Sequence, residues 1–189
     1  MKLTMAWLRK QEACSDGMDW FKAFGKSDSV EVMEGLLKDG KLNWANWLIV
    51  RLLNLEDRIR YAIFASEQVI DRFEKEYPEY KRPRLAIEAA KDVLKRNSAE
   101  TRKSAWDAAR DALDDGDAVD AEAATWAARP AGAARAAWAA GAAGAAVDAG
   151  DAVAATAATW AAWAAGDAGN IVKEKIIRYG IELHVKGER

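Results

Sequence analysis

The stretch "LEDRIRYAIFASEQVIDRFEKEYPEY", residues 55–80, carries the clearest secondary-structure signal in the chain. Apolar or small side chains recur there at steps of three and four residues, which is typical of the buried face of an α-helix. These residues are Ile59, Ala62, Ile63, Ser66, Val69, Ile70 and Phe73. Most of the charged residues between them, Arg58 included, are expected to face water. Because Pro78 cannot continue a helix, we predict one amphipathic helix that ends at this proline.

Two shorter helices are predicted before this segment, within residues 14–25 and 27–40. Each combines a polar residue that can cap its first turn, apolar residues at helical spacing and a glycine that can end it. The candidate caps are Ser15 or Asp16 for the first helix and Ser27, Asp28 or Ser29 for the second, and the glycines are Gly25 and Gly40. Residues 43–54 are strongly apolar but short, so both a helix and a strand remain open.

Amphipathic helices are also predicted over residues 82–97 and in the tail, residues 170–189. Pro83 suits the first turn of the former and Asn97 its end, while Asn170 can cap the latter. The residues expected to face the core are Leu85, Ala86, Ala89 and Val93 or Leu94 in the former, and Ile171, Ile176, Ile177, Tyr179 and Ile181 in the latter.

Another helix is predicted over residues 98–116. Ser98, with Thr101 in the place of the usual acidic partner, forms an imperfect capping box at its start. Gly116 would end the helix in a turn. The acidic residues 114–122 do not match the spacing of a calcium-binding loop, so we interpret them as part of that turn and predict no metal site.

Residues 121–169 repeat alanine pairs with a period of three. In an α-helix this period drifts by roughly 60° per repeat, so no single residue type lines one face. Alanine favours helix, whereas the glycines and Pro130 interrupt it. We predict a layer of several short, closely packed helices with breaks at Pro130 and around residues 148–152, and partial disorder of the tract is the alternative.

These predictions define an all-α fold, a compact multi-helix bundle with an Ala-rich layer of short helices. Residues 1–120 form the amphipathic helical region, residues 121–169 the triplet tract, and residues 170–189 a C-terminal helix that packs back on the first region. At 189 residues, about half of them hydrophobic, we expect one domain overall.

Composition narrows the function classes. The formal net charge of −2 gives no electrostatic reason to expect nucleic acid or a membrane surface as partner. Cys14 and His184 are the only residues of their types, so neither a disulfide framework nor a zinc site is expected. We interpret Cys14 as a packed thiol and His184 as a surface or helix-end group. With no phosphate-binding loop, nucleophile motif or carboxylate pair, we predict no cofactor and no enzyme activity.

Several segments resemble a known group of proteins. The segments "LRKQEACSDGMDWF", "NWANWLIVRLL", "RYAIFASEQVIDRFEKEYP" and "KRPRLAIEAAK", with the closing "IIRYGIEL", are similar to a group of phage and prophage immunity proteins that also carry an Ala-rich tract. The most specific residues are Ala13, Cys14, Gly17, Trp20, Phe21, Trp44, Trp47 and those from Arg82 to Ala90. Within the tract, Trp, Gly, Val and Thr stand where the relatives more often have Tyr and Asp. The resemblance implies a role in immunity of the host cell.

We therefore expect a non-catalytic binding protein of phage or prophage origin, located in the bacterial cytoplasm, that sequesters a protein partner. The predicted partner-binding residues are Trp126, Trp138, Trp160 and Trp163, because exposed tryptophans dominate many interfaces. The alternative is a structural protein that self-assembles around the tract. A weaker alternative is nucleic-acid binding through the basic cluster of Lys81, Arg82 and Arg84.

Overall fold

The computed structural model describes residues 1–76, 78, 79, 81–122 and 169–188 of the chain. The described part is all-α, as predicted, and its only β-type pairing is an isolated bridge between Lys2 and Asp28. The helices are α1 (Met5–Lys10), α2 (Ser15–Phe24), α3 (Ser29–Lys38), α4 (Leu42–Leu52), α5 (Leu55–Glu67), α6 (Ile70–Glu76), α7 (Arg82–Lys95), α8 (Ala99–Glu122) and α11 (Asn170–Gly187).

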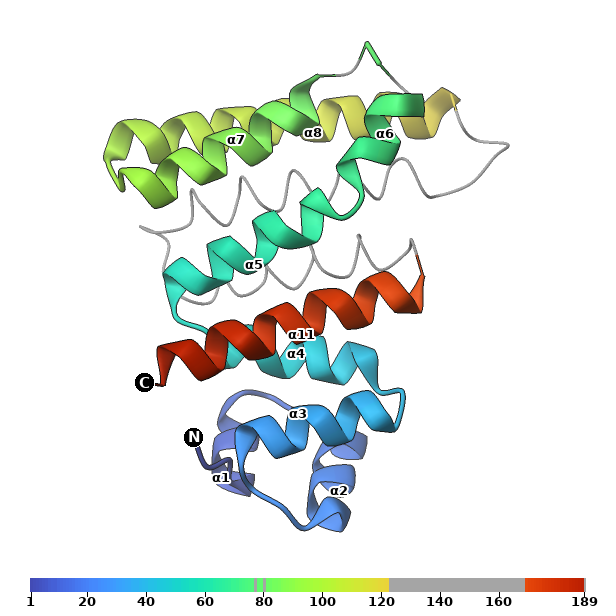
Figure 1. Cartoon of the computed structure of the whole chain (residues 1–189), viewed down its shortest axis with the longest axis vertical. Helices are drawn as coiled ribbons and strands as arrows, with labels where there is room; N and C mark the ends of the chain where they lie inside the picture. The colour runs from blue at the N-terminus through green and yellow to red at the C-terminus, as the bar shows by residue number, and fades with distance from the viewer. Residues whose placement is uncertain (77, 80, 123–168, 189) are drawn as a thin grey trace.

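The helices are stacked along the long axis of the molecule (Figure 1). At one end α1 and α2 cover α3, in the middle α4 and α11 lie side by side, and α5 leads to the α7–α8 pair at the other end. The C-terminal helix α11 packs on α3, α4 and α5. The two ends of the chain meet, and the Met1 ammonium group forms an ion pair with Glu188.

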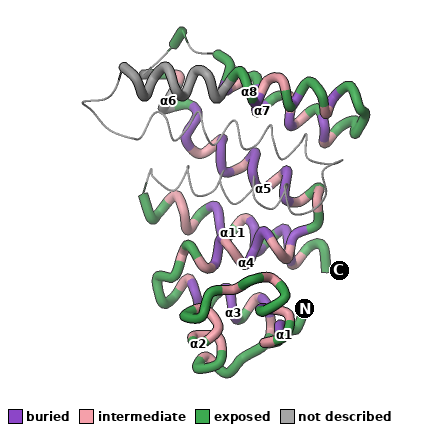
Figure 2. The backbone as a smooth tube through the Cα atoms, turned by 180° about the vertical axis from the view of Figure 1, so that it is seen from behind, coloured by how far each residue is buried: buried purple, intermediate pink, exposed green. Residues whose placement is uncertain are grey.

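Buried residues concentrate in the middle of this stack, on α4, α5 and α11 (Figure 2). Tyr61 of α5 is fully buried, and its hydroxyl donates a hydrogen bond to Asn46 Oδ1 of α4 at 2.8 Å. Burial raises the pKa of Tyr61, so this hydroxyl stays protonated. Gly180 of α11 faces the same place, and a Cβ atom there would lie 2.7 Å from both Ile49 Cγ1 and Tyr61 Cε2. The three helices therefore approach closely because position 180 has no side chain.

Residues 42–52 form a helix, so the strand alternative is wrong. The buried residues of α4 include Ala45, Leu48 and Ile49, at helical spacing. They are covered by α3 on one side and α11 on another. A short segment without a polar face is thus helical because neighbours pack around most of it.

The predicted single helix over residues 55–77 is wrong in one respect, because it breaks into α5 and α6. After Ser66 the backbone hydrogen bonds depart from the four-residue step of an α-helix. The amide of Val69 donates to Ser66 O at 3.1 Å, which is a three-residue step. The Ser66 hydroxyl donates to Ala62 O at 2.9 Å, a side-chain contact that competes with regular helix bonding. The predicted inward residues up to Ile70 are all buried, and Phe73 lies outside the described side chains.

Some helix ends agree with the predictions and others differ. Gly25 and Gly40 end α2 and α3 with φ of 73° and 68°, conformations that favour glycine. Asp28 caps α3 through its carboxylate, which accepts from two backbone amides at 3.0 and 3.2 Å. Ser98 and Thr101 do form a reciprocal box, each accepting the other's amide at 3.2 and 3.1 Å.

Three predicted ends are wrong. The cap of α2 is Cys14 rather than Ser15 or Asp16, and the cap of α11 is Gly169 rather than Asn170. The predicted turn at Gly116 is absent, because α8 continues to Glu122. The acidic residues 114–122 therefore lie within the helix, since a single glycine inside a helix costs only about 1 kcal/mol relative to alanine.

Most residues predicted to face the core in α7 and α11 are buried, among them Ala86, Val93, Ile176 and Ile177, but a few single positions differ. Leu85 in the first turn of α7 is 57% exposed and Ile171 in the first turn of α11 is 87% exposed, although both were expected to face the core. Arg58, expected in water, is buried, and its Nε donates to Val50 O at 2.7 Å. It thereby ties α5 to the last turn of α4. Residues in a first turn can project beyond the packed part of a helix, which periodicity does not reveal.

In the described ranges, no helix has the length and apolar character required to cross a membrane. The predicted division of the Ala-rich tract into short helices concerns residues that lie outside the described part of the chain.

Candidate binding site

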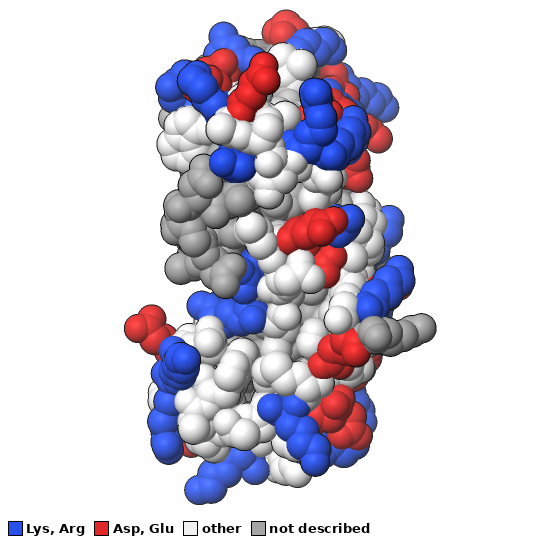
Figure 3. Space-filling model, turned by 90° about the vertical axis from the view of Figure 1, so that its left-hand side faces the viewer, with Lys and Arg blue, Asp and Glu red and all other residues white. Residues whose placement is uncertain are grey.

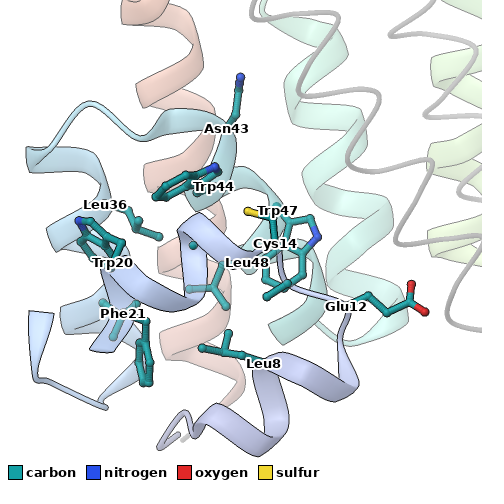
Figure 4. Close-up of a pocket in the computed structure, with 13 residues that line it drawn as sticks. Leu8, Glu12, Cys14, Trp20, Phe21, Leu36, Asn43, Trp44, Trp47 and Leu48 are labelled. Atoms are coloured by element: carbon teal, nitrogen blue, oxygen red, sulfur yellow. The ribbon is translucent and has the colours of Figure 1, made fainter. Parts of the chain in front are cut away.

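A cavity of about 260 Å³ lies between the first four helices (Figure 4). Its lining is almost wholly apolar and rich in aromatic rings. The lining residues are Leu8, Ala13, Cys14, Gly17, Trp20, Phe21, Val32, Leu36, Trp44, Trp47 and Leu48, together with the polar Glu12 and Asn43. The side chains of Glu12 and Asn43 point away from the group of rings, so polar atoms lie at the edge of the cavity rather than inside it (Figure 4).

The turn between α1 and α2 forms one side of the cavity. Glu12 has a φ of 60°, a left-handed conformation that is uncommon outside glycine. Its amide donates to Arg9 O and the amide of Ala13 donates to Leu8 O, both at 3.0 Å, which completes a Schellman motif at the end of α1. This motif changes the direction of the chain after α1. As a result Ala13 and Cys14 line the cavity, and α2 starts directly after them.

The aromatic residues of α2 are held by α3. Trp20 stacks on Phe24 with ring centroids 4.8 Å apart, and its indole N–H donates to Asp39 Oδ2 at 2.8 Å. Gly35 of α3 makes room for this pair, since a Cβ atom there would lie 2.6 Å from the ring of Phe24. The rings on this side therefore have a fixed orientation.

The two tryptophans of α4 carry cations on their rings. Lys41 Nζ lies 4.9 Å from the centroid of the Trp44 ring, and the Arg51 guanidinium lies 4.0 Å from that of Trp47. Arg51 Nη1 also donates to Trp47 O at 3.0 Å. Burial, together with the charge of nearby Arg58, lowers the pKa of Arg51 from its usual value. These contacts hold both indole rings in place before any ligand arrives.

Such a site has the composition of a binding pocket. Recognition pockets are mostly apolar with a few polar groups at defined places, and those for drug-sized molecules measure about 300–1,000 Å³. A cavity of about 260 Å³ is slightly smaller and suits a group of one or two rings. Within the ranges that the structure covers, no group of His, Cys, Asp and Glu side chains could hold a metal ion.

Cys14 and His184 differ from their predicted environments. The prediction of a packed thiol is wrong, because Cys14 is a free and exposed thiol in the turn before α2, where it lines the cavity. His184 does lie in the last turn of α11, but it is buried, and its Nε2 is 2.9 Å from Ser29 Oγ. Burial lowers the pKa of His184. Cys14 lies just before α2 and His184 in the last turn of α11, and His184 does not line the cavity.

One residue of the basic cluster, Arg84, is paired with neighbouring acids. Arg84 forms ion pairs with Asp71 at 2.7 Å and Glu74 at 2.6 Å. The hydrogen bond to Glu74 raises the pKa of Arg84 and lowers that of Glu74. Arg82 also has an interaction partner, and Lys81 is exposed. At this end of the molecule acidic and basic side chains are intermixed (Figure 3), so the surface lacks the uniform positive charge that phosphate binding favours.

Trp126, Trp138, Trp160 and Trp163 lie outside the described residues. The cavity was not predicted from the sequence, because its lining comes from four helices. One signal was present, since Trp44 and Trp47 are three residues apart and so share a helix face. In the structure, that face meets the glycine and aromatic residues of α2.

The geometry thus defines an all-α protein with an aromatic cavity between its first four helices. Comparisons of the chain with protein-family models, curated proteins and solved structures found no match. The resemblance to phage immunity proteins therefore stays a prediction from the sequence.

Proposed function

We propose that this chain is a non-catalytic binding protein that holds an apolar, ring-sized group in the cavity between α1 and α4. The observation that carries the proposal is the cavity itself: about 260 Å³ lined by aromatic side chains whose orientation is fixed by stacking, hydrogen bonding and cation–π contacts. Preorganised rings add affinity because binding does not have to order them.

The resemblance supports the same site. Seven residues that carry it most specifically also line the cavity, namely Ala13, Cys14, Gly17, Trp20, Phe21, Trp44 and Trp47. If the chain shares the role of the proteins it resembles, its immunity function depends on what this cavity binds. Sequestering of a partner would then proceed through one apolar group of that partner placed among the rings.

Filling the cavity tests the proposal. Gly17 lies in α2 and lines the cavity, and a Cβ atom there would have only Cys14 Sγ nearby, at 3.3 Å. Gly17→Leu should therefore occupy the cavity and favour the helix. Ala23→Leu, at an exposed position of α2, adds a side chain without filling it.

The measurement is titration calorimetry with 3-methylindole, followed by the same titration of both variants. We expect binding to the native chain and to Ala23→Leu, and loss of binding in Gly17→Leu with an unchanged circular dichroism spectrum. Equal binding by all three proteins, or no binding to the native chain, overturns the proposal.

A further inference from the structure

A second hollow adjoins the aromatic cavity. It measures about 280 Å³, and Asn43 and Trp44 line both spaces. Its other lining residues are Gly40, Lys41, Leu42, Asn170 and Lys173. The composition therefore changes across Trp44, from rings on one side to amides and two ammonium groups on the other.

The two lysines have no carboxylate partner among the residues that the structure describes. Lys41 Nζ lies over the ring of Trp44, and Lys173 Nζ donates to the side-chain oxygen of Asn43 at 3.1 Å. The acidic groups close to them in sequence have other partners. Asp39 accepts the indole N–H of Trp20, and Glu174 binds Arg178 through two hydrogen bonds of 2.9 and 2.7 Å.

The backbone adds to the positive character of the hollow. The helices α4 and α11 lie side by side and both begin at this end, so their N-termini point the same way (Figure 1). Lys41 and Gly169, the cap residues of these helices, make no side-chain cap bond. The first-turn amides and both helix dipoles then favour an anion beside Lys41 and Lys173.

We propose that the ligand of the aromatic cavity is an amphiphilic anion, with its ring between α1 and α4 and its carboxylate between Lys41 and Lys173. This inference rests on the proposed function and adds the chemical class of the ligand. Trp44 lines both parts of the site: its ring borders the apolar group, and the ammonium group of Lys41 over that ring faces the carboxylate. A cation of the same size is disfavoured by both lysines.

Three probes with the same ring separate shape from charge: indole-3-propionate, neutral 3-methylindole and cationic tryptamine. The charge-assisted contact between the carboxylate and the lysines should make indole-3-propionate bind about tenfold more tightly than 3-methylindole. Tryptamine should bind more weakly than either of them. The preference for the anion should decrease with added salt, because the lysines are at the surface.

Lys173→Gln removes one charge and keeps an amide that can donate to Asn43. The matched control is Lys175→Gln, which removes the same charge from the same helix at a residue that lines another hollow, next to Phe64. We expect the first variant to lose most of the tenfold preference while it binds 3-methylindole normally, and the control to retain the preference.

The outcomes distinguish the two proposals. If 3-methylindole binds but indole-3-propionate binds no better, or if both lysine variants behave alike, the anion inference is wrong and the apolar site stands. If none of the three probes binds, the proposed function fails and the anion inference fails with it.

Discussion

Replacing Gly180 with alanine tests how closely α11 packs on α4 and α5. The new Cβ atom would lie 2.7 Å from Ile49 Cγ1, and 2.7 and 3.0 Å from two ring atoms of Tyr61. Real Cβ atoms essentially never approach other heavy atoms closer than 3.0 Å. Since Ile49 and Tyr61 are both fully buried, neither can move into solvent.

The expected loss of stability follows from two opposing effects. Overpacking of a core costs about 1–3 kcal/mol, and the upper part of that range applies because two buried side chains must shift. Alanine recovers about 1 kcal/mol because it favours a helix interior more than glycine does. The net destabilisation is therefore about 1–2 kcal/mol.

Urea unfolding followed by circular dichroism measures this difference as a lower midpoint at an unchanged slope. Gly187→Ala is the matched control on the same helix, because the nearest atom to its Cβ would be Asp57 Oδ2 at an ordinary 3.7 Å. The control should be as stable as the native chain or up to about 1 kcal/mol more stable. If Gly180→Ala is as stable as Gly187→Ala, the close packing of α11 described above is refuted.

Three further changes test other parts of the structure. Tyr61→Phe removes the hydroxyl that bonds to buried Asn46 and should cost about 1–2 kcal/mol in urea unfolding, whereas Tyr179→Phe, at a half-buried ring, should change little. Burial lowers the pKa of His184, so the imidazole binds a proton more strongly in the unfolded chain than in the folded one. The contribution of His184 to the free energy of unfolding should therefore be constant above about pH 7 and decrease as the pH falls through about 6.5. A similar decrease in His184→Gln would contradict this assignment. Glu12→Gly places glycine at a left-handed position and should increase the free energy of unfolding by up to about 1 kcal/mol, seen as a higher urea midpoint. An unchanged or lower midpoint would show that the turn stores no strain.

Much of the candidate site could not be predicted from the sequence. Trp44 and Trp47 share a helix face by their spacing, and Trp20 and Phe21 lie in a segment that was predicted to be a short helix. That these faces meet around a cavity depends on the left-handed turn at Glu12 and on Gly35, whose missing side chain accommodates the ring of Phe24. Neither contact has a local sequence pattern.

Local sequence was enough to specify the all-α class and many helix ends, because periodicity, capping and helix-ending glycines act over a few neighbouring residues. Asp28, Gly25 and the Ser98–Thr101 pair lie where their local chemistry predicts. Which residues are enclosed was settled by tertiary packing instead. The packing buries Arg58 and His184 and leaves Leu85 exposed, since burial depends on which distant helix lies opposite. For the same reason, the aromatic cavity and its neighbouring lysines exist only once α1–α4 and α11 are packed together.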